Sequence, residues 1–134
     1  AAHGTAGRIA GLRENINFDT IFKTCRKAKT IHFVHFGSCL FGNEKNLNRL
    51  LRKPSNLIWA AGYEKEVDWV DSMSFDLLLW NRLIPDVRRK RGEVKQFQTA
   101  VGAFLGESPG LAGNLGFRFH YRRGKKLCAL PETE

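Results

Sequence analysis

Two short motifs carry residue types that could catalyse acyl transfer. His3-Gly4 places an imidazole beside a residue without a side chain, and Cys39 follows the small residues Gly37 and Ser38. A thiol becomes a nucleophile when a nearby base favours its thiolate, and imidazole is the usual base. The backbone N–H groups of Gly4 and Cys39 could then bind the oxyanion of a tetrahedral intermediate. These residues predict a Cys39–His3 dyad with a two-donor oxyanion hole.

The two motifs can meet only if the fold brings their loops to one edge of a sheet. Residues 30–36 and 56–63 are apolar, β-branched and aromatic runs typical of buried strands, and amphipathic helices are expected around them. This alternation predicts the α/β class, as a three-layer sandwich around a mostly parallel sheet. Right-handed crossovers place both strand ends at one rim, where open sheets bind ligands. Segments 37–39 and 62–69 follow these strands, and segment 3–4 would do the same if a strand preceded it. All three are therefore expected to converge there.

Capping and breaker residues predict the remaining elements. Asn17 or Asp19 can begin a helix whose apolar face includes Cys25, whereas Pro85 and Gly106 are expected to end helices. Helices are predicted at 18–27, 43–53, 68–83 and 93–105, loops at 3–15, 85–92 and 106–115, and a C-terminal β-hairpin at 116–130 around Arg123-Gly124.

Length and composition limit the class of protein further. A chain of 134 residues with 43% apolar content predicts one domain, 1–134, and excludes a mainly disordered chain. No apolar run approaches the roughly 20 residues that a membrane span needs. The three widely spaced cysteines argue against a disulfide scaffold and for a reducing compartment, so a cytoplasmic location is predicted. The oligomeric state is left open.

The order of these motifs resembles the caspase-like clan of cysteine peptidases, which includes the caspases, metacaspases, gingipains and bacterial caspase-like domains. The resemblance rests on HGTAG, on IHFVHFGSC and on the IWAAGY strand with the helix after it, within residues 3–83. It implies a cysteine endopeptidase in which His3 is the general base, Cys39 the nucleophile and Gly4 an oxyanion-hole donor. The implied partner is a peptide or protein substrate. No metal or cofactor is required, although calcium activates some metacaspases.

The resemblance also implies where a substrate would bind. The position two residues before the nucleophile often lines the first specificity pocket, and here it is the uncharged Gly37. Tyr63, Val67 and Trp69 are expected to form an apolar wall. Asp68 or Asp71 would supply the charge of a charged pocket. In the clan, strands and a helix precede the His-Gly loop, so we expect an N-terminally truncated caspase-like domain.

Several of these side chains also fit purely structural roles. Asp68 and Asp71 would favour the dipole at a helix N-terminus. His35 and His120 are expected to be packed or hydrogen-bonded residues of the sheet. For Trp59, Trp69 and Trp80, core packing is favoured over a role as a platform for a ligand.

Two functions other than peptidase activity stay open. A caspase-like domain without activity would be a scaffold or regulator, with Cys39 as a small packed residue. A net charge of +9, the basic run at 87–92 and residues 121–126 of the hairpin would suit a basic nucleic-acid-binding α/β domain. Such basic runs are usually solvated loops, so nucleic acid is the less favoured partner.

Overall fold

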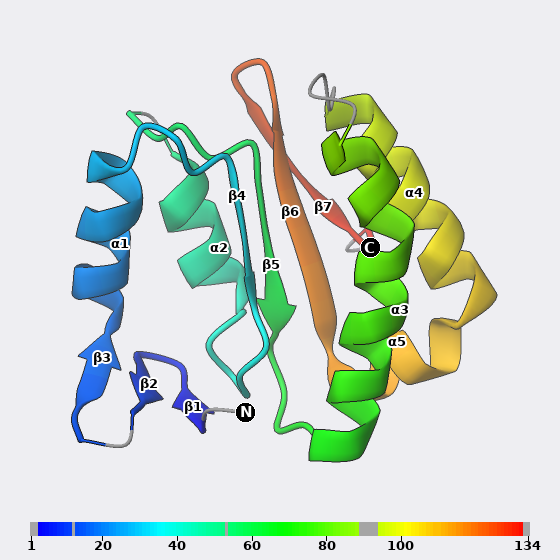
Figure 1. Cartoon of the computed structure of the whole chain (residues 1–134), viewed down its shortest axis with the longest axis horizontal. Helices are drawn as coiled ribbons and strands as arrows, with labels where there is room; N and C mark the ends of the chain where they lie inside the picture. The colour runs from blue at the N-terminus through cyan, green and yellow to red at the C-terminus, as the bar shows by residue number, and fades with distance from the viewer. Residues whose placement is uncertain (1–2, 12, 53, 89–93, 133–134) are drawn as a thin grey trace.

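A four-stranded mixed sheet with helices on both faces forms the centre of the molecule (Figure 1). The computed structural model describes residues 3–11, 13–52, 54–88 and 94–132. The strand order is β4–β5–β6–β7, comprising β4 (Phe33–Phe36), β5 (Trp59–Tyr63), β6 (Phe117–Arg123) and β7 (Lys126–Leu130). The α/β class and the C-terminal hairpin are confirmed. The sheet is mixed rather than mostly parallel, because only β4 and β5 run parallel and the hairpin adds two antiparallel pairings.

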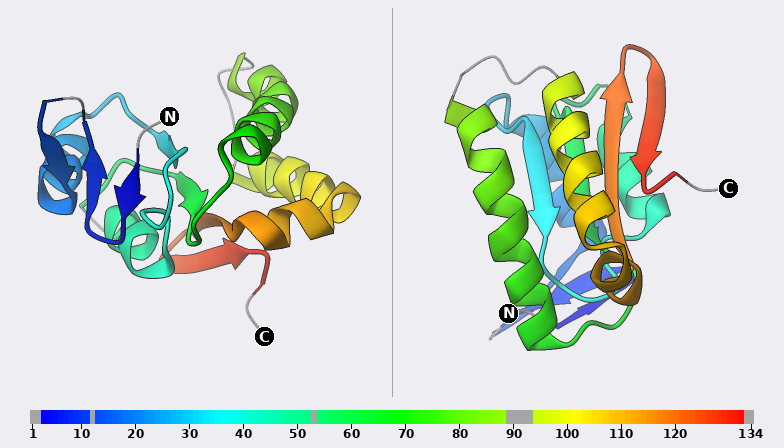
Figure 2. Two further views of the ribbon diagram at one scale, coloured as in Figure 1. Left: turned by 90° about the horizontal axis from the view of Figure 1, so that it is seen from below. Right: turned by 90° about the vertical axis from the view of Figure 1, so that its right-hand side faces the viewer.

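The two faces of the sheet bury different side chains, because residues alternate along each strand. On β5, Trp59, Ala61 and Tyr63 join the cluster beneath α3, α4 and α5, whereas Ala60 joins the cluster beneath α1 and α2 (Figure 2). All four side chains are fully buried. The helices are α1 (Phe18–Lys27), α2 (Glu44–Leu51), α3 (Trp69–Arg88), α4 (Val94–Glu107) and α5 (Pro109–Leu115).

Residues 3–15 were expected to form a loop, and this expectation is wrong. They contribute to a small antiparallel sheet of β1 (Gly4–Thr5), β2 (Arg8–Ala10) and β3 (Asn15–Asn17), paired in that order. β3 leads directly into α1, and the Asn17 side chain accepts the Thr20 N–H at 2.9 Å. The helix predicted at 18–27 is confirmed, with Asn17 as its N-cap.

Where breaker residues were expected to end helices, the structure differs. α3 continues through Pro85 to Arg88, because packing of the buried Leu79 and Leu83 outweighs the one helical hydrogen bond that proline removes. The expected basic loop therefore begins in a helix, and residues 89–92 lie outside the described residues. The expected loop at 106–115 is largely helix α5, which has proline in its first turn and ends at Gly116 with a φ of 61°.

None of the helices in the described part of the chain has the length and apolar character that crossing a lipid bilayer requires.

Candidate active site

The loops after β4 and β5 meet at the carboxyl ends of these strands. The Leu40 N–H donates to the Lys65 carbonyl at 3.2 Å, and the Gly42 N–H donates to the Tyr63 carbonyl at 3.0 Å. A Cβ on Gly42 would lie 2.3 Å from backbone atoms of Gly62 and Tyr63. Only glycine allows the two backbones to approach this closely. The loop that carries Cys39 is therefore fixed to its neighbour through backbone contacts.

The His3-Gly4 segment reaches the same rim from the small N-terminal sheet. A Cβ on Gly4 would lie 2.3 Å from the Cys39 carbonyl oxygen and 3.1 Å from the Ser38 hydroxyl oxygen. The chain thus brings together two motifs that are widely separated in sequence. Glycine at position 4 is required here because any side chain would overlap the Cys39 backbone.

The Gly4 N–H lies outside the ladder between β1 and β2. Gly4 is opposite Ile9, while the Ala10 N–H donates to the His3 carbonyl at 2.7 Å. This pattern makes Gly4 and Ile9 a non-hydrogen-bonded pair, whose own N–H groups point away from the partner strand. The backbone geometry therefore leaves the Gly4 N–H as a possible donor to a ligand.

The backbone directly after Cys39 is strained. Leu40 has a φ of 62°, in the left-handed region that costs energy for residues other than glycine. The Phe41 N–H donates to the Cys39 carbonyl at 2.6 Å and closes a γ-turn of the rarer, strained hand. Phe41 is fully buried, and its burial offsets the strain. Strain of this kind gathers at functional sites in proteins.

The Cys39 sulfur is partly buried and faces the loop between β5 and α3. The Val67 N–H donates to Sγ at 3.5 Å, and Sγ lies 3.9 Å from the Val67 carbonyl oxygen, to which the thiol donates. His3 is exposed, and within the described residues its ring has no hydrogen-bond or ion-pair partner. The structure brings the backbone of the His3-Gly4 motif to Cys39, but it does not join the imidazole to the thiol.

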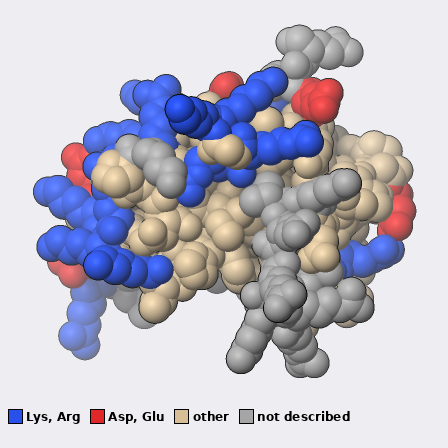
Figure 3. All heavy atoms as spheres, turned by 90° about the horizontal axis from the view of Figure 1, so that it is seen from above, with Lys and Arg blue, Asp and Glu red and all other residues tan. Residues whose placement is uncertain are grey.

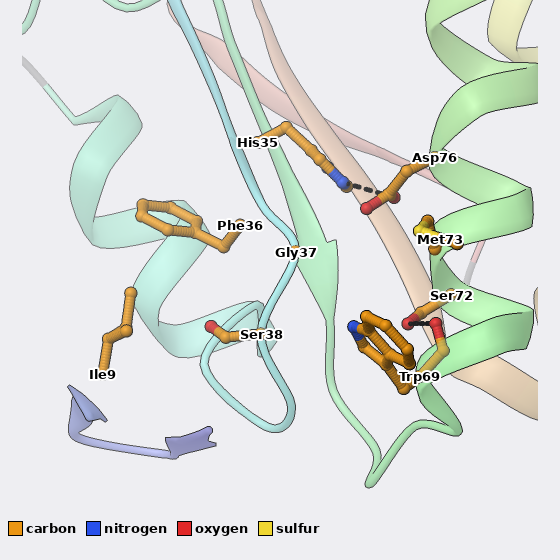
Figure 4. Close-up of a pocket in the computed structure, with 9 residues that line it drawn as sticks. All are labelled: Ile9, His35, Phe36, Gly37, Ser38, Trp69, Ser72, Met73 and Asp76. Atoms are coloured by element: carbon orange, nitrogen blue, oxygen red, sulfur yellow. Dashed lines mark hydrogen bonds and ion pairs between the residues drawn. The ribbon is translucent and has the colours of Figure 1, made fainter. Parts of the chain in front are cut away.

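A pocket of about 460 Å³ opens between the end of β4 and helix α3, next to the Cys39 segment (Figure 4). Gly37 and Trp69, two of the expected substrate-binding residues, both line it. Trp69 is 58% exposed, so the core role is wrong for this tryptophan, whereas Trp59 is buried and Trp80 packs against the core. The lining residues are Ile9, His35, Phe36, Gly37, Ser38, Trp69, Ser72, Met73 and Asp76.

Asp76 gives this pocket a carboxylate that two buried side chains hold in place. His35 Nε2 lies 2.7 Å from Asp76 Oδ1, and the Tyr63 hydroxyl donates to the same oxygen. Burial raises the pKa of Tyr63, and its hydrogen bond with Asp76 and the charge of Asp76 raise it further. Tyr63 therefore stays protonated and donates. It supports the pocket from behind rather than forming its wall, and the expected hydrogen-bonded role of His35 is confirmed.

Asp68 and Asp71, the carboxylates considered for a charged pocket, do not line it. Asp68 caps α3 instead, since its Oδ1 accepts the N–H groups of Val70 at 2.8 Å and Asp71 at 3.1 Å. Helical spacing is only a partial signal for the carboxylate that does line the pocket, because it relates that residue to Trp69 but not to β4. Asp76 lies seven positions after Trp69, two turns along the same helix face, in the direction of β4.

The opposite end of the sheet is basic. Figure 3 views the molecule from the end where the β6–β7 turn lies, and Lys and Arg side chains cover much of that face. Two residues of the expected nucleic-acid-binding patch have structural roles in the fold instead. Tyr121 is buried, and Arg122 donates to the carbonyls of Leu51 and Ser55 at 3.0 and 3.1 Å. These contacts leave Tyr121 unable to serve as an open stacking platform.

Comparisons with known proteins give no further assignment. No protein-family model matches the chain, and neither the curated proteins nor the solved structures contain a match. The resemblance to the caspase-like clan therefore remains an expectation drawn from the motifs. Among the residues that the structure describes, no three or more His, Cys, Asp or Glu side chains are grouped so that they could hold a metal ion.

Proposed function

We propose that the chain is a cysteine endopeptidase domain in which Cys39 is the nucleophile and His3 the general base. The observation that carries this proposal is the contact of Gly4 with the Cys39 carbonyl. His3 directly precedes Gly4, a Cα–Cα step of about 3.8 Å, so the general base is one residue away from the point of contact with the nucleophile's backbone. The strained turn at Leu40 and the Gly4 N–H outside the β1–β2 ladder support the same rim as the reaction site.

The proposed reaction uses only groups of this chain and water. His3 takes the thiol proton as the Cys39 sulfur bonds to the scissile carbonyl carbon. The N–H groups of Gly4 and Cys39 donate to the oxyanion that forms. Collapse of this intermediate breaks the C–N bond, and His3 gives its proton to the leaving amine. Water then hydrolyses the thioester, which releases the carboxylic acid and restores the thiol.

An active-site probe tests the proposal. A peptidyl acyloxymethyl ketone should label the wild-type chain and the Cys128→Ala control, but not Cys39→Ala. Because a positioned general base contributes on the order of 100-fold or more, His3→Ala should slow labelling and peptide cleavage by about that factor. Labelling that persists in Cys39→Ala would overturn the proposal.

A non-catalytic scaffold is the second candidate. The observation that favours it is the position of the Cys39 sulfur, which contacts Val67 and not the exposed His3 ring. Rates of Cys39 alkylation by iodoacetamide, measured against pH in the wild type and in His3→Ala, separate the two candidates. Identical profiles would favour the scaffold, and a His3-dependent profile would favour the peptidase.

A further inference from the structure

The pocket beside Cys39 is placed to receive one particular part of a peptide substrate. It begins at Gly37 and Ser38, the two residues directly before the proposed nucleophile. A peptide whose carbonyl lies at Cys39 would therefore direct the side chain of that same residue toward the pocket. The chemistry of the pocket lining then decides which substrate side chain fits. This inference rests on the proposed peptidase function.

One oxygen of the Asp76 carboxylate is left for a ligand. His35 and Tyr63 both bind Oδ1, so Oδ2 is the oxygen without a role in that network. Oδ2 faces Gly37, because a Cβ built on Gly37 would lie 3.1 Å from it. The missing side chain at position 37 thus leaves open the approach from the Cys39 segment to the carboxylate (Figure 4).

No Lys or Arg side chain pairs with Asp76 in the pocket, because the lining residues include neither. His35 and Tyr63, the two side chains that bind the carboxylate, both bind Oδ1. A cationic ligand would therefore find Oδ2 as an acceptor that no cation of the lining occupies.

The walls of the pocket fit the rest of a long basic side chain. Trp69 is 58% exposed and Met73 is 45% exposed, and both lie on α3 at the pocket, in the two turns before Asp76 (Figure 4). Aliphatic stems pack on such apolar surface, and a guanidinium or ammonium group is attracted to an indole face. Ser72 is already engaged through its hydroxyl with the Trp69 carbonyl at 3.2 Å. The cavity of about 460 Å³ is large enough for one such side chain.

We propose that this pocket selects lysine or arginine at the residue that donates the scissile carbonyl, and that Asp76 is the specificity-determining residue. An acidic side chain would meet the Asp76 carboxylate and be rejected. A neutral aliphatic side chain would leave Asp76 Oδ2 without a hydrogen-bond partner. Discrimination against uncharged side chains on the order of 100-fold or more is expected where a site loses a charged hydrogen-bond partner.

Fluorogenic peptides that differ only in that residue test the inference. Peptides with Arg or Lys should be cleaved, and those with Leu or Asp should be cleaved about 100-fold more slowly. Asp76→Asn keeps an acceptor for His35 and Tyr63 but removes the charge, so it should abolish the preference. Asp71→Asn, an exposed acid on the same helix outside the pocket, should keep it. Faster cleavage of the Leu or Asp peptide, or an unchanged preference in Asp76→Asn, would overturn the inference.

Binding of agmatine, a guanidinium on a four-carbon stem, separates the pocket from the peptidase chemistry. Measured by calorimetry on the Cys39→Ala chain, agmatine should bind, and Asp76→Asn added to it should weaken binding at least about 10-fold. Met73→Lys places a competing cation in the pocket without touching the Asp76 hydrogen bonds, and it should weaken binding similarly, unlike Met73→Leu. Agmatine binding that depends on Asp76, without any peptide cleavage by the wild-type chain, would support the cation-binding pocket and contradict the proposed peptidase function. Peptide cleavage without agmatine binding would support the peptidase function and contradict the cation-binding pocket.

Discussion

The Cys39 segment and the Asp76 pocket are neighbours, but different parts of the chain hold them in place. Backbone contacts fix the Cys39 segment: Gly4 lies against its carbonyl, and Gly42 lies against the end of β5. Side chains fix the pocket, since buried His35 and Tyr63 orient the Asp76 carboxylate. One rim of the sheet thus combines two kinds of support, namely close backbone contacts and side-chain hydrogen bonds. Glycine substitutions should damage the first, and loss of single hydrogen bonds should damage the second.

The largest effect is expected from Gly42→Ala. The added methyl group would overlap the backbone of Gly62 and Tyr63, which lies 2.3 Å from the Cβ position. Backbone atoms cannot move aside cheaply, so the free energy of unfolding should fall by more than about 3 kcal/mol. Urea denaturation measures this loss.

Gly102→Ala is the matched control for that substitution. Gly102 lies inside α4, and no atom lies within 4 Å of its Cβ position. Alanine is the better helix former, so the control should be more stable by about 0.5–1 kcal/mol. Equal losses in both variants would show that the backbone contact at Gly42 does not fix the Cys39 loop.

Gly4→Ala should act on Cys39 more than on the fold. Its Cβ would lie 2.3 Å from the Cys39 carbonyl oxygen, so the short N-terminal sheet must move away from the rim. We expect a loss of about 1–2 kcal/mol in stability and a fall of at least about 10-fold in labelling of Cys39. Gly7→Ala has open space around its Cβ and should change neither value. Normal labelling of Gly4→Ala would separate the His3-Gly4 motif from the thiol chemistry.

Tyr63→Phe should damage the pocket and spare the Cys39 segment. The substitution removes the hydroxyl that donates to Asp76 and, at 3.3 Å, to the Ser72 carbonyl. A hydrogen bond to a charged group contributes about 1.5–3 kcal/mol, and the free energy of unfolding should fall by that amount. Agmatine binding should weaken while the rate of Cys39 labelling stays unchanged. A parallel loss of both would mean that the two regions do not have separate supports.

The smallest effect is expected at His120, on the other face of the sheet. Its Nδ1 donates to Asn48 Oδ1 at 2.8 Å, and burial lowers its pKa from the usual 6.5. The nearby Glu44 and Glu64 raise this pKa and Arg118 lowers it, but burial is the largest cause. The unfolded chain therefore binds a proton that the folded chain resists, and stability is lost as the pH falls below about 6.5.

Urea midpoints at pH 7 and pH 5 measure this loss. His120→Gln should reduce the fall in midpoint, while Cys39 labelling and agmatine binding at pH 7 stay at wild-type values. A fall of the same size in His120→Gln would assign the pH dependence to other groups.

Local sequence signals predicted most of the helices and strands. Where these predictions were wrong, tertiary packing or the shortness of the element is the reason. Asn17 and Asn43 cap the helices that follow them, because their side chains reach N–H groups three residues ahead. Pro85 did not end its helix, because packing of the buried Leu79 and Leu83 outweighs the helical hydrogen bond that proline removes. The short strands at 3–15 escaped detection, since each has only two or three residues and shows no alternation.

By itself, the sequence determined the residue types at the rim: an imidazole beside glycine, a thiol after two small residues, and strands whose ends must meet. Crossover chirality predicts that the loops after β4 and β5 meet, whereas the meeting of Gly4 with Cys39 depends on the small N-terminal sheet, which was not predicted. Only the tertiary structure decided which carboxylate enters the pocket. Asp68, Asp71 and Asp76 are chemically alike, and the rotation of α3 against β4 turns Asp76 toward His35 and leaves Asp68 as a helix cap. That rotation depends on the packing of the whole buried face, which no local pattern encodes.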